Sequence, residues 1–179
     1  MENNQWQIDN TWTLFLDRDG VLNRKIDHDY VRNWEQFEFL PGVKEALAIC
    51  AEKFNRIVIV TNQRGVGRGL MAESDLHEIH MLLMDAVDEA GGRIDAIFFC
   101  PDIIDEGSTH RKPNPGMAFD AQRLFPEIDF SKSVIVGDSG SDMEFGKNLG
   151  MKTVLIGDKL MPTADILFPS LIKFVVTLV

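Results

Sequence analysis

Two aspartates, Asp17 and Asp19, directly follow the apolar run at 13–16 and precede a glycine. Carboxylates this close repel each other unless a cation, a shared proton or solvent lies between them. The run predicts a strand buried on both faces, as in parallel sheets, with both carboxylates at its carboxyl end. Open α/β sheets bind their ligands at that edge. The alternative is a solvated turn, because Asp and Gly are common turn residues.

The same pattern occurs twice more, since the apolar runs at 57–60 and 133–136 also end in polar residues. The polar residues are Thr61, Asn62 and Gln63 after the first run, and Asp138 and Asp142 after the second. The carboxyl ends of parallel strands lie on one edge of the sheet, so these residues are expected to converge. The expected site offers carboxylates and a hydroxyl, without an obvious serine, histidine or cysteine nucleophile.

A cation pair, Arg111 and Lys112, precedes the sequence Pro-Asn-Pro at 113–115. The prolines restrict the backbone, so both cations are expected in a defined place. Beside carboxylates, such a pair suits a phosphoryl group. A solvated basic pair is the alternative.

Hard oxygen ligands from Asp17 and Asp138, without thiolates or a histidine cluster, favour magnesium over zinc. A carboxylate beside such a metal can attack phosphorus and form an acyl phosphate that water then hydrolyses. The metal and Lys112 would neutralise the transferring group, and the Thr61 hydroxyl would hydrogen-bond one of its oxygens. Asp19 can protonate the leaving alkoxide if its neighbours raise its pKa. Arg18 is expected to point elsewhere.

The elements that must position these residues alternate between strand and helix. Further strands are expected at 94–100, 153–156 and 164–168, and helices at 43–54, 73–89, 115–125 and 141–149. The segment from Pro169 is predicted as a helix, although 174–176 favour a strand locally. This alternation predicts one domain, residues 1–179, with a doubly wound, Rossmann-like parallel sheet flanked by helices.

Three segments do not fit a simple strand or helix. Residues 21–40 lack a sustained period and are predicted to form a long functional loop. The alternating glycines at 65–69 indicate either a flexible turn or a backbone surface that approaches a phosphate, and they are not expected to open directly into a helix. On the helix at 73–89, His77 and His80 are expected to be surface and boundary residues rather than ligands.

The composition is that of a globular protein, with 45% hydrophobic and 26% charged residues among 179. The net charge of -10 argues against a nucleic-acid or anionic-membrane partner. No apolar stretch approaches the roughly 20 residues that span a bilayer, and residues 1–5 lack the pattern of a signal peptide. Cys50 and Cys100 are expected to be reduced, buried thiols of a cytoplasmic protein. These patterns do not predict an oligomeric state.

Taken together, these motifs resemble those of the haloacid dehalogenase (HAD) superfamily of phosphohydrolases. The matching segments, in chain order, are Asp17-Arg18-Asp19-Gly20, Thr61-Asn62-Gln63, Lys112, and Gly137-Asp138 with Asp142. Extended around these motifs, residues 17–23, 61–69 and 111–117 resemble the subfamily of histidinol phosphatases and D-glycero-D-manno-heptose 1,7-bisphosphate phosphatases. The resemblance implies a HAD-like fold, and no insertion large enough for a cap domain is visible.

The same resemblance implies roles for individual residues. It implies Asp17 as nucleophile, Asp19 as acid and base, and magnesium bound by Asp17, the Asp19 carbonyl and Asp138. Asp142 is expected to support Lys112 or the second metal shell. The substrate contacts that it implies are Asp27, His28, Asp29, Tyr30, Thr61, Asn62, Gln63, Arg64, Arg111 and Lys112.

One departure from the subfamily concerns zinc. The subfamily usually carries Cys-x-His followed by Cys-x-Cys before Arg-Lys-Pro, whereas this chain keeps only Cys100 and has Asp102 at the histidine position. One thiolate cannot make a four-ligand site, so no structural zinc is expected. The missing loop also changes the wall of the substrate pocket.

The expected function is therefore magnesium-dependent hydrolysis of a small phosphorylated metabolite. Among sugar phosphates, heptose 1,7-bisphosphate is favoured over the alternative, histidinol phosphate. Removal of a nucleic-acid 3′-phosphate is disfavoured because no basic groove is visible. A catalytically idle phosphosugar-binding module is the alternative from another class, although such a module has no need of both Asp17 and Asp19.

Overall fold

The computed structural model describes residues 6–103 and 107–179. Its six strands form one sheet in the order β3-β2-β1-β4-β5-β6, and every neighbouring pair is parallel. The strands are β1 (Thr13–Leu16), β2 (Arg56–Asn62), β3 (Ala96–Cys100), β4 (Ser133–Gly137), β5 (Lys152–Ile156) and β6 (Ile166–Phe168). The predicted doubly wound sheet is confirmed. Residues 1–5 and the middle of the loop after Asp102 lie outside the described residues.

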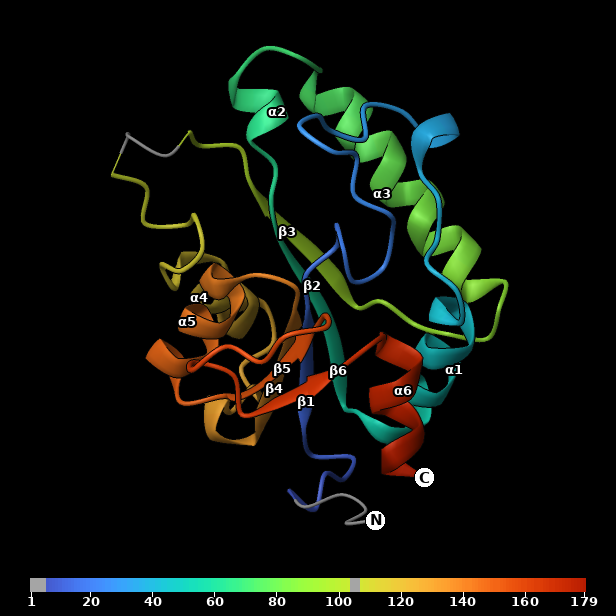
Figure 1. The fold of residues 1–179 in the computed structure, drawn as a ribbon, viewed down its shortest axis with the longest axis vertical. Coiled ribbons are helices and arrows are strands. Elements are labelled where there is room, and N and C mark those ends of the chain that lie inside the picture. The colour runs from blue at the N-terminus through green and yellow to red at the C-terminus, as the bar shows by residue number, and fades with distance from the viewer. Residues whose placement is uncertain (1–5, 104–106) are drawn as a thin grey trace.

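Helices cover both faces of this sheet (Figure 1). One face carries α1 (Val43–Lys53), α3 (Glu73–Asp88) and α6 (Leu171–Val175), and the other carries α4 (Gly116–Leu124) and α5 (Gly140–Leu149). Alternation along β1 explains the two cores, because Leu14 and Leu16 pack into one cluster and Phe15 into the other. The sheet is thus buried on both sides, as its apolar strands predict.

The central strand β1 determines where the predicted site lies. Its last residue, Leu16, is in register with Ile59 of β2 and Val136 of β4. Asp17 then donates its backbone N–H to the Val136 carbonyl at 2.9 Å, so Asp17 stays beside the end of β4. The polar residues that follow β1, β2 and β4 therefore meet at one edge of the sheet.

The loop at 21–40 is anchored into the core. Val21, Leu22 and Val31 are almost fully buried, and Leu40 N donates to the Leu22 carbonyl at 3.0 Å. The loop contains one 3₁₀ turn, η1 (Trp34–Gln36), and passes beside α3 (Figure 1). These anchors place the exposed stretch 24–29 at the carboxyl edge of the sheet.

Two local predictions need correction. The glycine-rich segment at 65–69 begins inside a helix that was not predicted, α2 (Arg64–Gly67), and Gly65 lies against the ring of Tyr30. His80 is not a boundary residue, since only 6% of it is exposed. The helix predicted at the end of the chain is confirmed: α6 packs on α1, and the helically spaced Leu171 and Phe174 are buried.

Two general expectations can also be compared with the fold. Both cysteines are buried and unpaired. Within the described ranges, no helix is both long enough and apolar enough to cross a membrane.

Candidate active site

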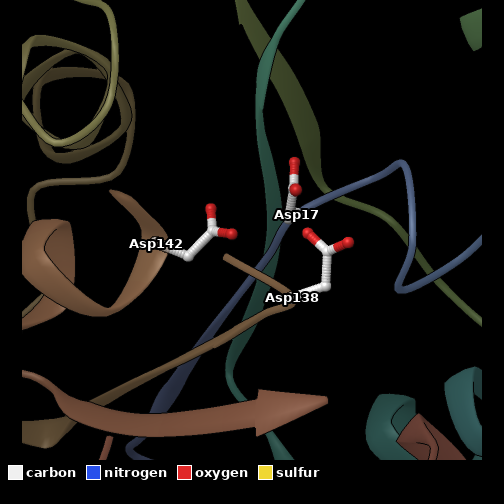
Figure 2. Close-up of side chains that lie close together, drawn as sticks. All are labelled: Asp17, Asp138 and Asp142. Carbon is white, nitrogen blue, oxygen red and sulfur yellow. The ribbon is translucent and has the colours of Figure 1, made fainter. Parts of the chain in front are cut away.

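Three carboxylates from different elements face a common point at the edge of the sheet (Figure 2). Asp17 follows β1, Asp138 follows β4, and Asp142 lies in the first turn of α5. One oxygen from each lies within 4.8 Å of the other two. Asp138 Oδ1 is buried and has no hydrogen-bond partner. An unsatisfied carboxylate oxygen within a set of oxygen donors fits a hard divalent cation such as magnesium.

The close approach of these carboxylates depends on two glycines. Gly20 has a φ of +88°, and a Cβ built there would lie 2.1 Å from Asp138 Oδ2. A Cβ at Gly137 would lie 2.2 Å from the Cβ of Asp142. Both positions therefore exclude any side chain, which gives the glycines of the first and last motifs a steric role.

Lys112 is the buried cation of the site. Its Nζ lies 2.9 Å from Asp17 Oδ1 and 2.6 Å from Asp142 Oδ1, and it donates to the Val60 carbonyl at 2.7 Å. Burial lowers the pKa of this ammonium, but the two carboxylates outweigh burial and raise its pKa. Asn62 fixes the lysine backbone, since its Oδ1 accepts from Lys112 N at 3.0 Å.

Asp17 is almost completely buried, with 8% of the residue exposed. Burial, and next the charge of Asp142, raise its pKa to about 7, although Lys112 acts in the opposite direction. Without a bound cation, the Asp17 carboxyl group is therefore only partly ionised near neutral pH. A divalent cation would favour its carboxylate form.

Asp19 is held by three side chains. Arg18 Nη2 lies 3.1 Å from both carboxylate oxygens, Asn23 Nδ2 donates at 2.9 Å and Gln63 Nε2 at 2.7 Å. Burial raises the pKa of Asp19, but the Arg18 charge and these hydrogen bonds outweigh burial, so its pKa is lowered. A raised pKa, the condition that the sequence sets for proton donation by Asp19, is therefore not met in the substrate-free protein. Arg18, expected to point elsewhere, is fully buried and contacts Asp19.

A cavity of about 500 Å³ opens in front of the carboxylates. Most predicted substrate-contact residues line it: Asp27, His28, Asp29, Tyr30, Asn62, Arg64 and Lys112. Tyr30 and Arg64 are joined, because Arg64 Nε donates to the Tyr30 hydroxyl at 2.7 Å. The loop at 21–40 and the first turn after β2 therefore form one wall.

Three predicted substrate contacts do not line this cavity. Thr61 is fully buried, and its hydroxyl accepts a hydrogen bond from Gln63 Nε2 at 2.9 Å, so both residues lie beneath the carboxylates. Arg111 is absent from the cavity lining and donates to the Asp102 carbonyl at 3.2 Å. Of the predicted cation pair, only Lys112 faces the site.

Four polar residues that were not predicted also line the cavity: Lys25, Arg68, Ser139 and Ser141. Lys25 forms an ion pair with Asp138, and although burial lowers its pKa, the hydrogen bond and charge of Asp138 raise it. No periodic pattern identifies a lysine in an irregular loop. Arg68 follows Arg64 by four residues, a spacing that indicates a shared face only when a helix is expected there.

Several known proteins are similar to this chain. A HAD-hydrolase-like family model matches residues 109–172. Over 171 residues, the chain is 43% identical to the D-glycero-alpha-D-manno-heptose-1,7-bisphosphate 7-phosphatase of Mycobacterium bovis, covering 92% of this chain and 90% of that protein. The chain belongs to the heptose-bisphosphate phosphatase family of the HAD superfamily.

Other members of this family are also similar. A D-glycero-beta-D-manno-heptose-1,7-bisphosphate 7-phosphatase of Rhodopseudomonas palustris is 39% identical over 145 residues, covering 76% of this chain and 78% of that protein. The crystal structure of the D,D-heptose 1,7-bisphosphate phosphatase of Bordetella bronchiseptica, complexed with magnesium and phosphate, superimposes with a TM-score of 0.84. That enzyme is 31% identical, and the match covers 93% of this chain and 97% of the other.

The segment where the subfamily usually carries its zinc loop is organised by a hydroxyl in this family member. Ser108 Oγ accepts hydrogen bonds from the backbone of His110 at 3.1 Å and of Arg111 at 3.0 Å, and it lies 3.5 Å from Cys100 Sγ. These contacts shape the backbone immediately before Lys112. That the chain binds no structural zinc stays a prediction.

Proposed function

We propose that this chain is a magnesium-dependent phosphomonoesterase that removes the 7-phosphate of D-glycero-D-manno-heptose 1,7-bisphosphate through an aspartyl-phosphate intermediate. The observation that carries the proposal is the contact of Asp17 with Lys112 at 2.9 Å, beside the unsatisfied Asp138 oxygen and at the base of an open cavity. The names of relatives with up to 43% identity support the substrate.

In the first half-reaction, an Asp17 carboxylate oxygen attacks phosphorus, and the bond from phosphorus to the sugar oxygen breaks. Asp19 gives a proton to that oxygen as it leaves. In the second, water attacks the phosphorus of the acyl phosphate, Asp19 takes the proton, and Asp17 is released with inorganic phosphate. Asp19 thus begins each cycle protonated, although Arg18 favours its ionised form in the substrate-free protein.

Magnesium, held by Asp17, Asp138 and the Asp19 carbonyl, would neutralise charge on the phosphoryl group. Lys112 adds a fixed positive charge and keeps Asp17 oriented, while Asp142 holds the lysine from the other side. The buried hydroxyl of Thr61 supports Gln63, which in turn holds Asp19.

A bisphosphate needs a second anion site in the same cavity. Arg64 and Arg68 line it and are one helical turn apart on α2 and its C-cap. We assign them to the phosphate that is not hydrolysed, because guanidinium groups bind phosphate oxygens well. The loop residues Asp27, His28 and Asp29 then contact the polar sugar between the two phosphates.

The proposal also includes the domain organisation, the cellular compartment and the class of partner of the enzyme. Residues 1–179 act as a single HAD-like domain, since the strands of the described residues form one sheet and the described site residues gather at one of its edges. A phosphorylated sugar substrate and two free thiols are typical of the cytoplasm. The net charge of -10 supports a small metabolite rather than a nucleic acid or a membrane as partner.

Phosphate release from a panel of substrates tests the proposal. The panel contains both anomers of the heptose 1,7-bisphosphate, histidinol phosphate and simple hexose phosphates, each with magnesium and with Asp17→Asn as control. We expect a heptose bisphosphate to exceed the others by at least about 100-fold in kcat/KM, with phosphorus NMR showing that the 7-phosphate is lost.

Other outcomes separate the alternatives. Preference for histidinol phosphate would change the assigned substrate, whereas the aspartyl-phosphate mechanism would stand. Absence of turnover on the whole panel, together with calorimetric binding of a heptose bisphosphate, would favour the phosphosugar-binding module. Turnover that survives in Asp17→Asn would contradict the aspartyl-phosphate mechanism.

A further inference from the structure

A buried histidine lies behind the general acid of the proposed reaction. His80 Nε2 on α3 lies 3.2 Å from Arg18 Nη1, and Arg18 Nη2 contacts both oxygens of Asp19 at 3.1 Å. Arg18 is fully buried and His80 is 6% exposed. The three side chains therefore form a continuous row from the helix layer to the cavity wall.

The direction of the hydrogen bond between His80 and Arg18 follows from chemistry. A guanidinium group only donates, so His80 Nε2 must accept, and the ring proton lies on Nδ1. Burial, and next the charge of Arg18, lower the pKa of His80 to about 3, which agrees with a neutral imidazole. The Phe99 ring, with its centroid 6.0 Å from that of His80, packs on the same imidazole.

The contacts with His80 and Asp19 restrict the rotation of the Arg18 guanidinium group more than they stabilise its burial. The Arg18 Nε is buried without a hydrogen-bond partner, and a buried guanidinium carries a large desolvation penalty. Its guanidinium group contacts His80 on one side and Asp19 on the other. Removing the His80 acceptor would leave the guanidinium free to rotate, and the orientation of Asp19 would change with it.

We propose that His80 is a positioning residue that holds Asp19, through Arg18, in the orientation needed to protonate the leaving group. The inference rests on the proposed phosphatase function. The nucleophile Asp17 is held independently, by Lys112, and is not expected to respond to changes at His80. Loss of His80 should therefore affect proton donation and not nucleophilic attack.

Substrates with different leaving groups distinguish these two steps. An alkoxide needs a proton as it leaves, whereas p-nitrophenolate is a stable anion that does not. We would measure kcat and kcat/KM of His80→Phe on the preferred sugar phosphate and on p-nitrophenyl phosphate. We expect about a tenfold or larger loss on the sugar phosphate and less than about a threefold loss on the aryl ester, as general acid catalysis contributes factors of this size or more.

Two matched variants complete the experiment. His80→Gln retains a side-chain acceptor and should recover most of the lost activity. His77→Phe changes an exposed histidine of the same helix, with 58% of its side chain exposed, and should leave both substrates unaffected. If His80→Phe does not fold, Arg18→Lys keeps the charge but removes the fork that joins His80 to Asp19, and it should show the same selective loss.

The outcomes that overturn the inference are distinct. Equal losses on both substrates, or no recovery in His80→Gln, would mean that His80 only supports the fold, and the phosphatase function would stand. A wild-type chain that hydrolyses neither ester would overturn the phosphatase function and this inference together.

Discussion

Lys112 Nζ lies 2.6 Å from Asp142 Oδ1, and the two side chains are 2% and 0% exposed. The other oxygen of Asp142 accepts hydrogen bonds from the Ser139 backbone at 3.1 Å and its hydroxyl at 2.6 Å. Asp142 is therefore engaged by the lysine and by the start of α5. Asp138, with one unsatisfied oxygen, remains for a cation.

Asp142→Asn should destabilise the protein and reduce turnover, because the charge of Lys112 loses one of its two buried partners. We expect the free energy of unfolding to fall by about 3–5 kcal/mol in urea titrations. Glu38→Gln is the control, since it breaks an ion pair with Arg24 in which both side chains are 63% exposed, and it should change stability by less than about 1 kcal/mol. Equal effects of the two variants would show that the buried pair contributes little.

Lys25→Met should tighten magnesium binding. Lys25 pairs with Asp138, and this ammonium competes with a cation for the same carboxylate. The lysine side chain is 52% exposed, so the gain should be modest, up to about fivefold in the dissociation constant by calorimetry. Lys44→Met changes an exposed lysine that lies over the Phe39 ring and should have no effect. Weaker magnesium binding by Lys25→Met would show that Lys25 does not compete with the cation for Asp138.

Magnesium affinity should depend on pH through Asp17. Its folded-state pKa of about 7 lies above the ordinary value of 3.8, so metal binding must release a proton at lower pH. We expect affinity to fall by about tenfold for each pH unit below 7, and to level off above it. In the metal-free protein, the protonated Asp17 carboxyl group contributes fully to folding stability below pH 3.8. This contribution is lost as the pH rises from there through 7. Calorimetry in buffers of different ionisation enthalpy measures the number of protons released when magnesium binds. A magnesium affinity that does not change with pH would refute the raised pKa of Asp17.

Gly20→Ala should abolish magnesium binding. The new Cβ would collide with Asp138, and the φ of +88° adds backbone strain of about 1–2 kcal/mol. Gly91→Ala provides the control, because Gly91 has a φ of +80° but open space around its Cα. The control should lose similar stability and still bind magnesium. If both variants bind equally, the close approach of Gly20 to Asp138 is not required for the metal site.

The parts of the site that the sequence predicts are those with a local signal. Asp17 and Asp138 follow apolar runs, and the parallel sheet brings such strand ends together, whereas Lys112 precedes a proline that restricts the backbone. Lys25 and the role of Arg18 have no local signal, because each depends on a contact with a distant segment: Asp138 for one, His80 for the other. The lowered pKa of Asp19 depends on the charge of Arg18 and on hydrogen bonds from Asn23 and Gln63, whose orientations only the fold reveals.

Tertiary packing also decides the secondary structure where local signals conflict or are missing. The β-branched residues at 175–176 favour a strand locally, yet burial of Phe174 and Val175 against α1 selects a helix. In the helical turn after Gln63, Gly65 lies against the ring of Tyr30, a contact with a distant segment that local patterns do not predict. Spacing places His80 on the apolar stripe of α3, but only the fold reveals the arginine that it meets.

The catalytic residues and the cavity wall lie on different parts of the fold, the wall on the loop at 21–40. This separation has an evolutionary consequence. The nucleophile and its carboxylate neighbours stand on strand ends and on α5, whereas the cavity wall at 25–31 stands on a loop anchored at Val21, Leu22 and Val31. Substitutions within that wall can alter which sugar is accepted and leave the phosphorus chemistry intact. A library confined to these loop positions is therefore a direct route to phosphatases with new substrates from this scaffold.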